Sequence, residues 1–209
     1  METEAPVCQT IGFLLLDQFT LISLSCAVEP LRMANQLAGE ELYRWQTLSL
    51  DGQPVWASDG VSVTPDACAQ DQRGFDAVIV CGGVGIQQAI SPALIAWLRS
   101  QARLYCKRLG AVCTGSWALA QAGLLDGFQC SVHWELMASM QEAFTRVKVS
   151  SSVFTLDGNR FTSSGGTAPL DMMLHLIGRD HGHTLSAAIS QMFVYERIRN
   201  ERDHQRVPL

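Results

Sequence analysis

The sequence predicts an α/β fold of the flavodoxin-like type, with an open, mostly parallel sheet and helices on both faces. Short apolar runs such as Thr10–Leu16 and Asp76–Cys81 are typical of strands that are buried on both sides of a parallel sheet. Apolar residues at helical spacing follow the first of these runs, at Ala27–Leu37. The 209 residues include 47% hydrophobic and only 17% charged residues, which supports one compact domain with a substantial core.

The first part of the chain is expected to form a strand, a helix, a second strand and a hairpin. The helix Ala27–Leu37 follows the first strand, because polar side chains separate its apolar ones at the helical period. Tyr43–Leu50 alternates in polarity as a strand does. The turn signal Asp51–Gly52 then precedes a hairpin through Val55 and Val61–Val63.

The rest of the chain continues the alternation. Asp76–Cys81 is a buried strand that ends at two glycines. Ser91 is placed to cap a helix over Pro92–Arg108, because serine is favoured at the N-cap and proline at the first helical position. The later expected elements are a strand at Leu109–Val112, helices at Ser116–Ala122 and His133–Phe144, a hairpin of Val153–Leu156 and Arg160–Thr162 around Asp157-Gly158-Asn159, and helices at Thr167–Gly178 and Leu185–Arg199.

Charge and composition exclude several classes of protein. The net charge is 15 − 20 = −5, which disfavours nucleic-acid binding by these residues. The longest uncharged stretch, Ala77–Leu98, is interrupted by glycines and Pro92, so no membrane span is expected. The acidic start Met1–Pro6 is not followed by a signal-type apolar core, which predicts a cytoplasmic protein. Seven cysteines without CxxC spacing predict free thiols, most of them buried.

The most specific local signal is Gly110–Gly115, in which small residues surround Cys113 at a junction of strand and helix. A sharp turn of this kind holds its central residue in a strained backbone conformation. At the start of a helix, the dipole and the free amides lower the pKa of a thiol, so Cys113 is expected to be reactive. The alternative interpretation is a small buried core residue.

Other strand ends are expected to meet this cysteine, because ligands bind beyond the carboxyl ends of parallel strands. Gly83 and its neighbours could present backbone amides to an anion, although a tight turn explains the same glycines. His133 could orient a ligand, exchange a proton with the thiol, or have a structural role. Ser164 and the glycines after it could cap a helix or face a carboxylate ligand. The candidate ligand-binding residues are therefore Gly83, Val84, Cys113, Thr114, His133, Trp134, Ser164, Gly165 and Gly166.

The run Gly110–Gly127, followed by Ser131–Trp134, resembles the cysteine elbow and histidine segment of the ThiJ/PfpI, class I glutamine amidotransferase-like superfamily. The resemblance covers nearly the whole chain. More narrowly, Phe161–Ile177 and the ending Gln205–Leu209 are similar to the branch that forms the amino-terminal sensor domain of AraC-type transcription regulators. The resemblance implies a ligand-sensing domain over residues 1–195 and a helix end or linker over 196–209, without the DNA-binding helix-turn-helix module.

The resemblance implies that a small-molecule effector binds in a pocket beside Cys113. Regulators with similar carboxyl-terminal segments control the catabolism of arginine and of quaternary amines such as carnitine and glycine betaine. The implied effector is therefore a small nitrogenous metabolite of the amino acid or quaternary amine class. The resemblance also implies a homodimer, and DNA binding only through the missing module.

Enzymes of this superfamily usually carry an acidic residue after the first strand, which completes the cysteine site. Aligning Phe19–Glu29 with that segment puts Ser23 at the acidic position, so turnover is not expected unless Asp17 takes that role. The alternative function is a cysteine-dependent hydrolase, hydratase or glyoxalase-like enzyme that uses Cys113 and His133. A third interpretation is a redox protein in which Cys113 oxidises reversibly.

No metal and no cofactor are expected. His181 and His183 lack further ligands at metal spacing and indicate the turn that ends a helix. Trp117 follows the elbow and is expected in the core, whereas Trp134 lies nearer the pocket mouth and could face a cationic ligand. Near the carboxyl terminus, arginines alternate with acidic residues, which indicates a solvated helix and linker. The arginines in this pattern are Arg197, Arg199, Arg202 and Arg206.

Overall fold

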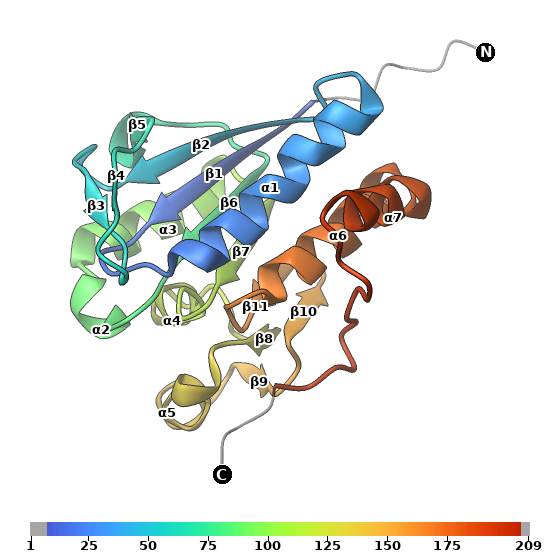
Figure 1. Cartoon of the computed structure of the whole chain (residues 1–209). Helices are drawn as coiled ribbons and strands as arrows, with labels where there is room; N and C mark the ends of the chain where they lie inside the picture. The colour runs from blue at the N-terminus through green and yellow to red at the C-terminus, as the bar shows by residue number, and fades with distance from the viewer. Residues whose placement is uncertain (1–7, 206–209) are drawn as a thin grey trace.

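The computed structural model describes residues 8–205 and has a mostly parallel seven-stranded sheet at its centre (Figure 1). The strand order is β10-β11-β7-β6-β1-β2-β5, and only β10 runs antiparallel to its neighbour. This is the predicted α/β class. The strands of this sheet are β1 (Gln9–Leu15), β2 (Tyr43–Ser49), β5 (Ala67–Cys68), β6 (Ala77–Cys81), β7 (Arg108–Val112), β10 (Phe154–Asp157) and β11 (Arg160–Ser163).

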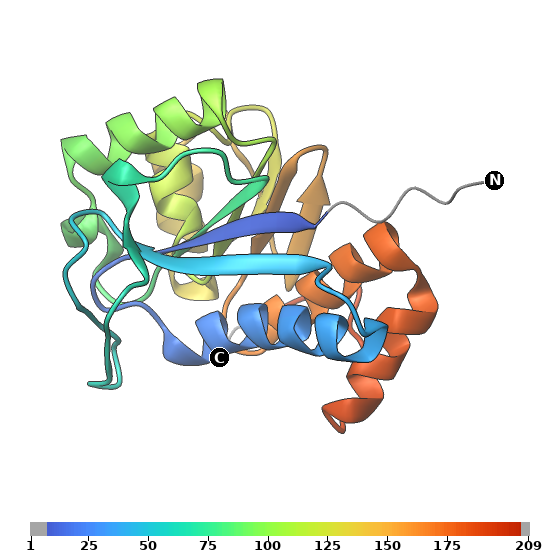
Figure 2. The same cartoon turned by 90° about the horizontal axis from the view of Figure 1, so that it is seen from above.

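Helices cover both faces of the sheet, as Figure 2 shows from above. One face carries α1 (Leu21–Ala38), α6 (Ala168–His181) and α7 (His183–Met192). The other carries α3 (Pro92–Leu104), α4 (Ser116–Gln121) and α5 (Met137–Ala143), with the short α2 (Ile86–Ala89) beside them.

The alternation of side chains along each strand divides the core into two layers. Phe13 of β1 is fully buried in the layer beneath α1 and α6, whereas its neighbour Leu14 is fully buried in the layer beneath α3 and α4. The central strands are therefore apolar at consecutive positions, which is why their sequences read as continuous hydrophobic runs.

Two small sheets lie outside the main one. β3 (Val55–Trp56) and β4 (Ser62–Val63) form the predicted hairpin, and β8 (Gln129–Ser131) pairs in parallel with β9 (Lys148–Ser150). The backbone amide of Ser131 donates to Thr162 Oγ1 at 2.8 Å, while the Ser131 carbonyl accepts from Ser116 Oγ at 2.8 Å. These bonds fix β8 against β11 and α4, and so place residue 133 at the edge of the main sheet.

Several element boundaries differ from those expected. The helix expected at Ala27–Leu37 begins at Leu21, because the uncharged residues before Ala27 continue it without a side-chain cap at Thr20. The helix expected at Pro92–Arg108 is capped by Ser91, as predicted, but ends at Leu104 because Arg108 begins β7. The expected helix His133–Phe144 begins as a 3-10 turn at Trp134–Leu136 and continues as α5.

The largest difference concerns the last expected helix, Leu185–Arg199. α7 begins at His183 and ends at Met192, and residues 193–205 have no helix. The expectation of a solvated terminal helix is therefore wrong. The predictions for Met1–Pro6, for Arg206 and for the rest of the ending to Leu209 concern residues outside the described range. Within residues 8–205, no helix is both long enough and apolar enough to span a bilayer.

Candidate functional site

Cys113 lies at the predicted junction, directly after β7 and before α4. Its φ is 58°, a left-handed conformation that residues with a side chain seldom adopt. The turn is tight because the chain passes close to β6. A Cβ atom on Gly115 would lie 2.2 Å from the Val80 carbonyl oxygen, so only glycine fits there. The strained elbow inferred from the sequence is present.

The Cys113 thiol is buried, with the residue 6% exposed. Burial raises the pKa of Cys113, although hydrogen bonds from Thr20 Oγ1 and from the backbone at Thr114 act in the opposite direction. Thr20 Oγ1 lies 3.4 Å from the sulfur. The expectation of a lowered pKa is therefore wrong, because desolvation of the thiol outweighs these hydrogen bonds.

The loop after β6 packs against the elbow. Thr114 Oγ1 donates to the Gly83 carbonyl at 2.7 Å, and the Val84 amide donates to the Gln18 carbonyl at 3.0 Å. A Cβ atom on Gly83 would lie 1.9 Å from the same Gln18 oxygen. The Val84 amide thus already donates a hydrogen bond within the protein, which argues against its expected role as a donor to an anion. Gly83 is required because the chain packs too closely there for a side chain.

A cavity of about 230 Å³ opens beside the thiol. It brings together five of the residues selected from the sequence, and the turn after β1 and the 3-10 turn after His133 complete its wall. His133 Nδ1 lies 3.5 Å from a carboxylate oxygen of Glu135, and Glu135 also raises the pKa of Cys113. The selected residues in this wall are Gly83, Val84, Cys113, Thr114 and His133, and the residues that the sequence analysis missed include Thr20 and Glu135.

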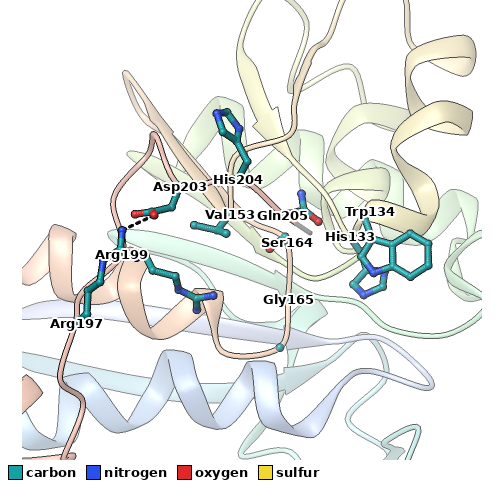
Figure 3. Close-up of a pocket in the computed structure, with 11 residues that line it drawn as sticks. His133, Trp134, Val153, Ser164, Gly165, Arg197, Arg199, Asp203, His204 and Gln205 are labelled. Atoms are coloured by element: carbon teal, nitrogen blue, oxygen red, sulfur yellow. Dashed lines mark hydrogen bonds and ion pairs between the residues drawn. The ribbon is translucent and has the colours of Figure 1, made fainter. Parts of the chain in front are cut away.

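A second cavity, of about 490 Å³, shares His133 with the smaller one (Figure 3). The remaining selected residues, Trp134 and Ser164 to Gly166, line it, and His133 lines both cavities. Cys113 lines only the smaller cavity, whereas Gly165 lines the larger one and approaches the thiol closely. A Cβ atom on this glycine would lie 3.0 Å from Cys113 Sγ.

The opposite wall of the larger cavity comes from residues 193–205, which we call the C-terminal strap. Figure 1 shows it running from the end of α7 back across the domain towards β9. The sequence analysis missed its contribution to the cavity. The strap residues that line this cavity are Arg197, Arg199, Asp203, His204 and Gln205.

A fully buried carboxylate, Asp171 of α6, holds the strap in place. It accepts hydrogen bonds from the Tyr195 hydroxyl at 3.0 Å, from the Arg199 amide at 2.7 Å and from Arg199 Nε at 2.8 Å. Farther along, Gln205 Nε2 donates to the Val132 carbonyl at 3.0 Å. One signal could have revealed this attachment, namely an aspartate among the apolar residues of the predicted helix Thr167–Gly178.

The sequence analysis aligned Ser23 with the acidic position of the superfamily's enzymes. Ser23 is fully buried in α1, and its hydroxyl donates to the Gly166 carbonyl at 3.5 Å. Asp17, the proposed substitute, is exposed in the turn after β1, and it is not among the groups that shift the pKa of Cys113. The acidic group that does so is Glu135, which lines the smaller cavity.

The other conspicuous residues lie where the sequence analysis expected them. Trp117 is buried in the core with its ring edge-on to Phe144, at a centroid distance of 5.0 Å. His181 ends α6 and His183 begins α7, on either side of Gly182. Residues 8–205 contain no group of three or more His, Cys, Asp or Glu residues that could hold a metal ion.

Comparisons with known proteins place this geometry in context. A profile of the DJ-1/PfpI family matches residues 9–179. The chain is 71% identical over 201 residues to the HTH-type transcriptional regulator GbdR of Pseudomonas aeruginosa, which covers 96% of the chain and 54% of GbdR. It is 44% identical to the HTH-type transcriptional regulator CdhR of the same organism, over 95% of the chain and 59% of CdhR. The chain thus spans little more than half the length of these relatives.

A solved structure agrees with the sequence comparisons. The crystal structure of an AraC family transcriptional regulator from Pseudomonas putida superposes with a TM-score of 0.80 at 29% sequence identity. The match covers 88% of this chain and 99% of that one.

Proposed function

Because this chain belongs to the DJ-1/PfpI family, and its close relatives are regulators rather than enzymes, we propose that it is the amino-terminal effector-sensing domain of an AraC-type transcription regulator. The effector is a small nitrogenous metabolite of the amino acid or quaternary amine class. It binds in a pocket beside Cys113, within the hollow formed by the two cavities.

One observation carries this proposal. The nine residues selected from the sequence come from four separate segments of the chain, and all of them line one of two cavities that share His133. The combined hollow is bounded by carboxyl ends of parallel strands, where ligands of open α/β sheets bind. Cavities of about 230 and 490 Å³ match the size of small metabolites.

The charges around the hollow suit a nitrogenous ligand. The ring of Trp134 offers an aromatic face to an ammonium group, and the carboxylates of Glu135 and Asp203 lie in the walls. Arg197 and Arg199 line the larger cavity and are paired with Asp203 and Asp171, so only their remaining N–H groups are free to bind a carboxylate on the same ligand.

Transmission of the signal would follow from differential binding. An effector that binds one arrangement of the domain more tightly than another shifts the population towards it. In this proposal the protein is a cytoplasmic homodimer, and DNA is bound by a helix-turn-helix part outside these 209 residues.

A thermal-shift screen tests the proposed function. The chain is incubated with amino acids, betaines and acylated amines, and a ligand that binds only the folded state raises the melting temperature. We expect a saturable shift with at least one of these compounds, and a weaker shift in the variant Trp134→Ala. A screen in which none of the compounds stabilises the protein would count against effector sensing.

The elbow favours a second function, because a cysteine in a left-handed turn beside a histidine is also the arrangement of a nucleophile. Here the chain would be a cysteine-dependent hydrolase or hydratase. Incubation with amides, isonitriles and dicarbonyls separates the two functions: product formation that is lost in Cys113→Ala supports the enzyme.

Intact-mass spectra after mild peroxide test reversible oxidation of the same thiol.

A further inference from the structure

Exposed apolar side chains gather at the end of the sheet where β1 and β2 finish (Figure 1). The Gln18 amide donates to the Trp56 carbonyl at 2.8 Å, and the Val84 amide donates to the Gln18 carbonyl at 3.0 Å. These bonds hold the β3–β4 hairpin, the turn after β1 and the loop after β6 side by side. Trp56 is 54% exposed and Val84 is 66% exposed, so the segments on both sides of Gln18 present apolar surface to water. Such a concentration of apolar surface indicates an interaction site.

Two carboxylates border this apolar surface. Asp17 precedes Gln18 in the turn, and Asp59 lies in the loop of the hairpin; both are exposed. Neither forms an ion pair with a cation of residues 8–205. An aromatic ring beside free carboxylates suits arginine and lysine side chains, through cation–π contacts and ion pairs. We call the surface formed by Asp17, Trp56, Asp59 and Val84 the hairpin face.

The hairpin face belongs mainly to a strongly acidic part of the chain. Residues 8–71 have a net charge of 2 − 8 = −6, whereas residues 72–205 have a net charge of 12 − 10 = +2. The two arginines of the acidic part are already paired, Arg32 with Glu29 and Arg44 with Glu41. The negative potential around the hairpin face is therefore poorly compensated, and this favours a basic partner.

The DNA-binding part of a longer regulator is a partner of this chemistry. The match with GbdR covers only 54% of that HTH-type regulator. Helix-turn-helix proteins contact phosphates with lysine and arginine, so such a part presents a basic surface. A second copy of this domain fits less well, because in a symmetric contact the hairpin face would meet its own like charges.

The course of the strap brings the chain close to this face. Gln205 Nε2 donates to the Val132 carbonyl at 3.0 Å, and the next residue, His133, lines the smaller cavity together with Val84. The segment that follows Gln205 thus starts within about one cavity's width of the hairpin face. A short linker is sufficient for a following domain to reach it.

We infer that the hairpin face docks the basic DNA-binding part of the regulator and competes with DNA for its lysine and arginine side chains. The inference rests on the part of the proposed function that puts DNA binding outside these 209 residues, and it adds an autoinhibitory contact. In the docked state the phosphate-binding side chains are occupied, so the affinity for DNA is lowered. Release of the contact restores that affinity.

Cross-linking tests the contact in a complete regulator, made by joining this chain to the DNA-binding remainder of Pseudomonas aeruginosa GbdR. A zero-length reagent couples carboxylates to lysine amines only where they touch, and peptide mass spectrometry locates the links. We expect links from Asp17 or Asp59 to lysines of the added part. A mixed-sequence DNA duplex of about 30 base pairs should reduce these links at least about threefold, because its phosphates displace the carboxylates.

Three variants assign the effect to the hairpin face. Asp17→Asn with Asp59→Asn removes two charges, and Trp56→Ala removes the ring but no charge; both should bind the duplex at least about threefold more tightly than the unmodified regulator. Glu142→Gln with Glu196→Gln is the matched control, because it removes two exposed charges elsewhere. At about 0.15 M salt, which screens long-range repulsion, it should bind within about 1.5-fold. Circular dichroism verifies that each variant is folded.

Three results would overturn the inference. The first is a set of links from the added part that avoids Asp17 and Asp59, and the second is equal duplex binding by the control and the hairpin-face variants. The third is a loss of dimer mass in light scattering when Trp56→Ala is made in the 209-residue chain, which would identify a second copy as the occupant.

The thermal-shift screen separates these results from effector sensing, because it uses the 209-residue chain without the added part. A compound that stabilises this chain supports effector sensing even where no docking is found. Links from the hairpin face support docking even where no compound stabilises the chain.

Discussion

At the scale of single residues, the sequence predicted which cysteine lies in the elbow, but it did not predict the pKa of that cysteine. The small residues around Cys113 predicted the elbow, because a tight turn beside a helix requires them. The pKa depends instead on how completely the surrounding segments cover the thiol, and Gly165, more than fifty positions later, provides part of that cover. Contacts between such distant segments are not encoded in local composition.

The hydroxyl of Thr20 provides a direct test of this thiol environment. Thr20→Val keeps the shape of the side chain but removes the hydrogen bond that favours the thiolate, so the pKa of Cys113 should rise further. Alkylation of Cys113 by iodoacetamide at neutral pH should slow by roughly two- to tenfold. Peptide mass spectrometry measures the rate, with Cys68 in the same sample as the reference. Unchanged or faster alkylation of Cys113 would contradict this account.

At the scale of elements, periodicity predicted the long central strands and the helices, but not the end of the chain. The expected helix Leu185–Arg199 continues a plausible helical pattern past Met192. The buried Asp171 instead binds Tyr195 and Arg199 from the side, which draws the segment away from the helix axis. A tertiary contact thus overrides local propensity. Strands of two or three residues, such as β5 and β8, are too short to produce a pattern.

The attachment of the strap depends on the Asp171 carboxylate. In Asp171→Asn the pair with Arg199 is lost, while the partly exposed guanidinium can turn to solvent. We expect about 1–3 kcal/mol less stability for the docked strap, and faster trypsin cleavage after Arg197, Arg199 or Arg202. Intact-mass spectra of timed digests measure this. Glu142→Gln, on the exposed side of α5, is the control, and equal cleavage rates in both variants would refute the role of Asp171.

The cap of α3 offers a simpler measurement. Ser91 Oγ accepts a hydrogen bond from the Leu94 amide at 3.1 Å, and Ser91→Ala leaves that amide without its partner. The free energy of unfolding in urea should fall by about 1 kcal/mol. Ser139→Ala, an exposed position on α5, should change it by less than about 0.5 kcal/mol. A loss in the control equal to that in Ser91→Ala would mean that the cap has no special role.

At the scale of the whole molecule, composition and apolar runs were sufficient for the fold class, because a sheet buried on both faces leaves a strong hydrophobic signal. The candidate site was predictable as a set of strand ends that meet at one edge. The division of this site into two cavities was not predictable from the sequence. It depends on how β8 positions His133 and on where the C-terminal strap packs against the domain.

Buried thiols make the stability of the whole domain sensitive to alkaline pH. Burial raises the pKa of Cys130 from 9.0 to about 11, and it raises that of Cys81 as well. The folded state therefore keeps protons that the unfolded state releases above pH 9, so stability is retained below this pH and falls as the pH rises towards 11. Each thiol contributes at most about 1.4 kcal/mol per pH unit.

Urea unfolding under reducing conditions at several pH values from 8 to 11 measures this decline. In Cys130→Ala the stability at pH 8 should be lower, because a buried side chain is truncated, but the decline with pH should be shallower. An identical slope in the wild type and the variant would show that Cys130 does not contribute.

The glycine at position 165 sets a limit on how this domain can be re-engineered. Its φ of 100° and its approach to the sulfur both exclude a side chain. A biosensor library that seeks new specificities should therefore hold residue 165 constant and randomise positions that line the larger cavity, such as Trp134, Val153 and His204. Diversity introduced at the glycine itself would yield mostly misfolded clones.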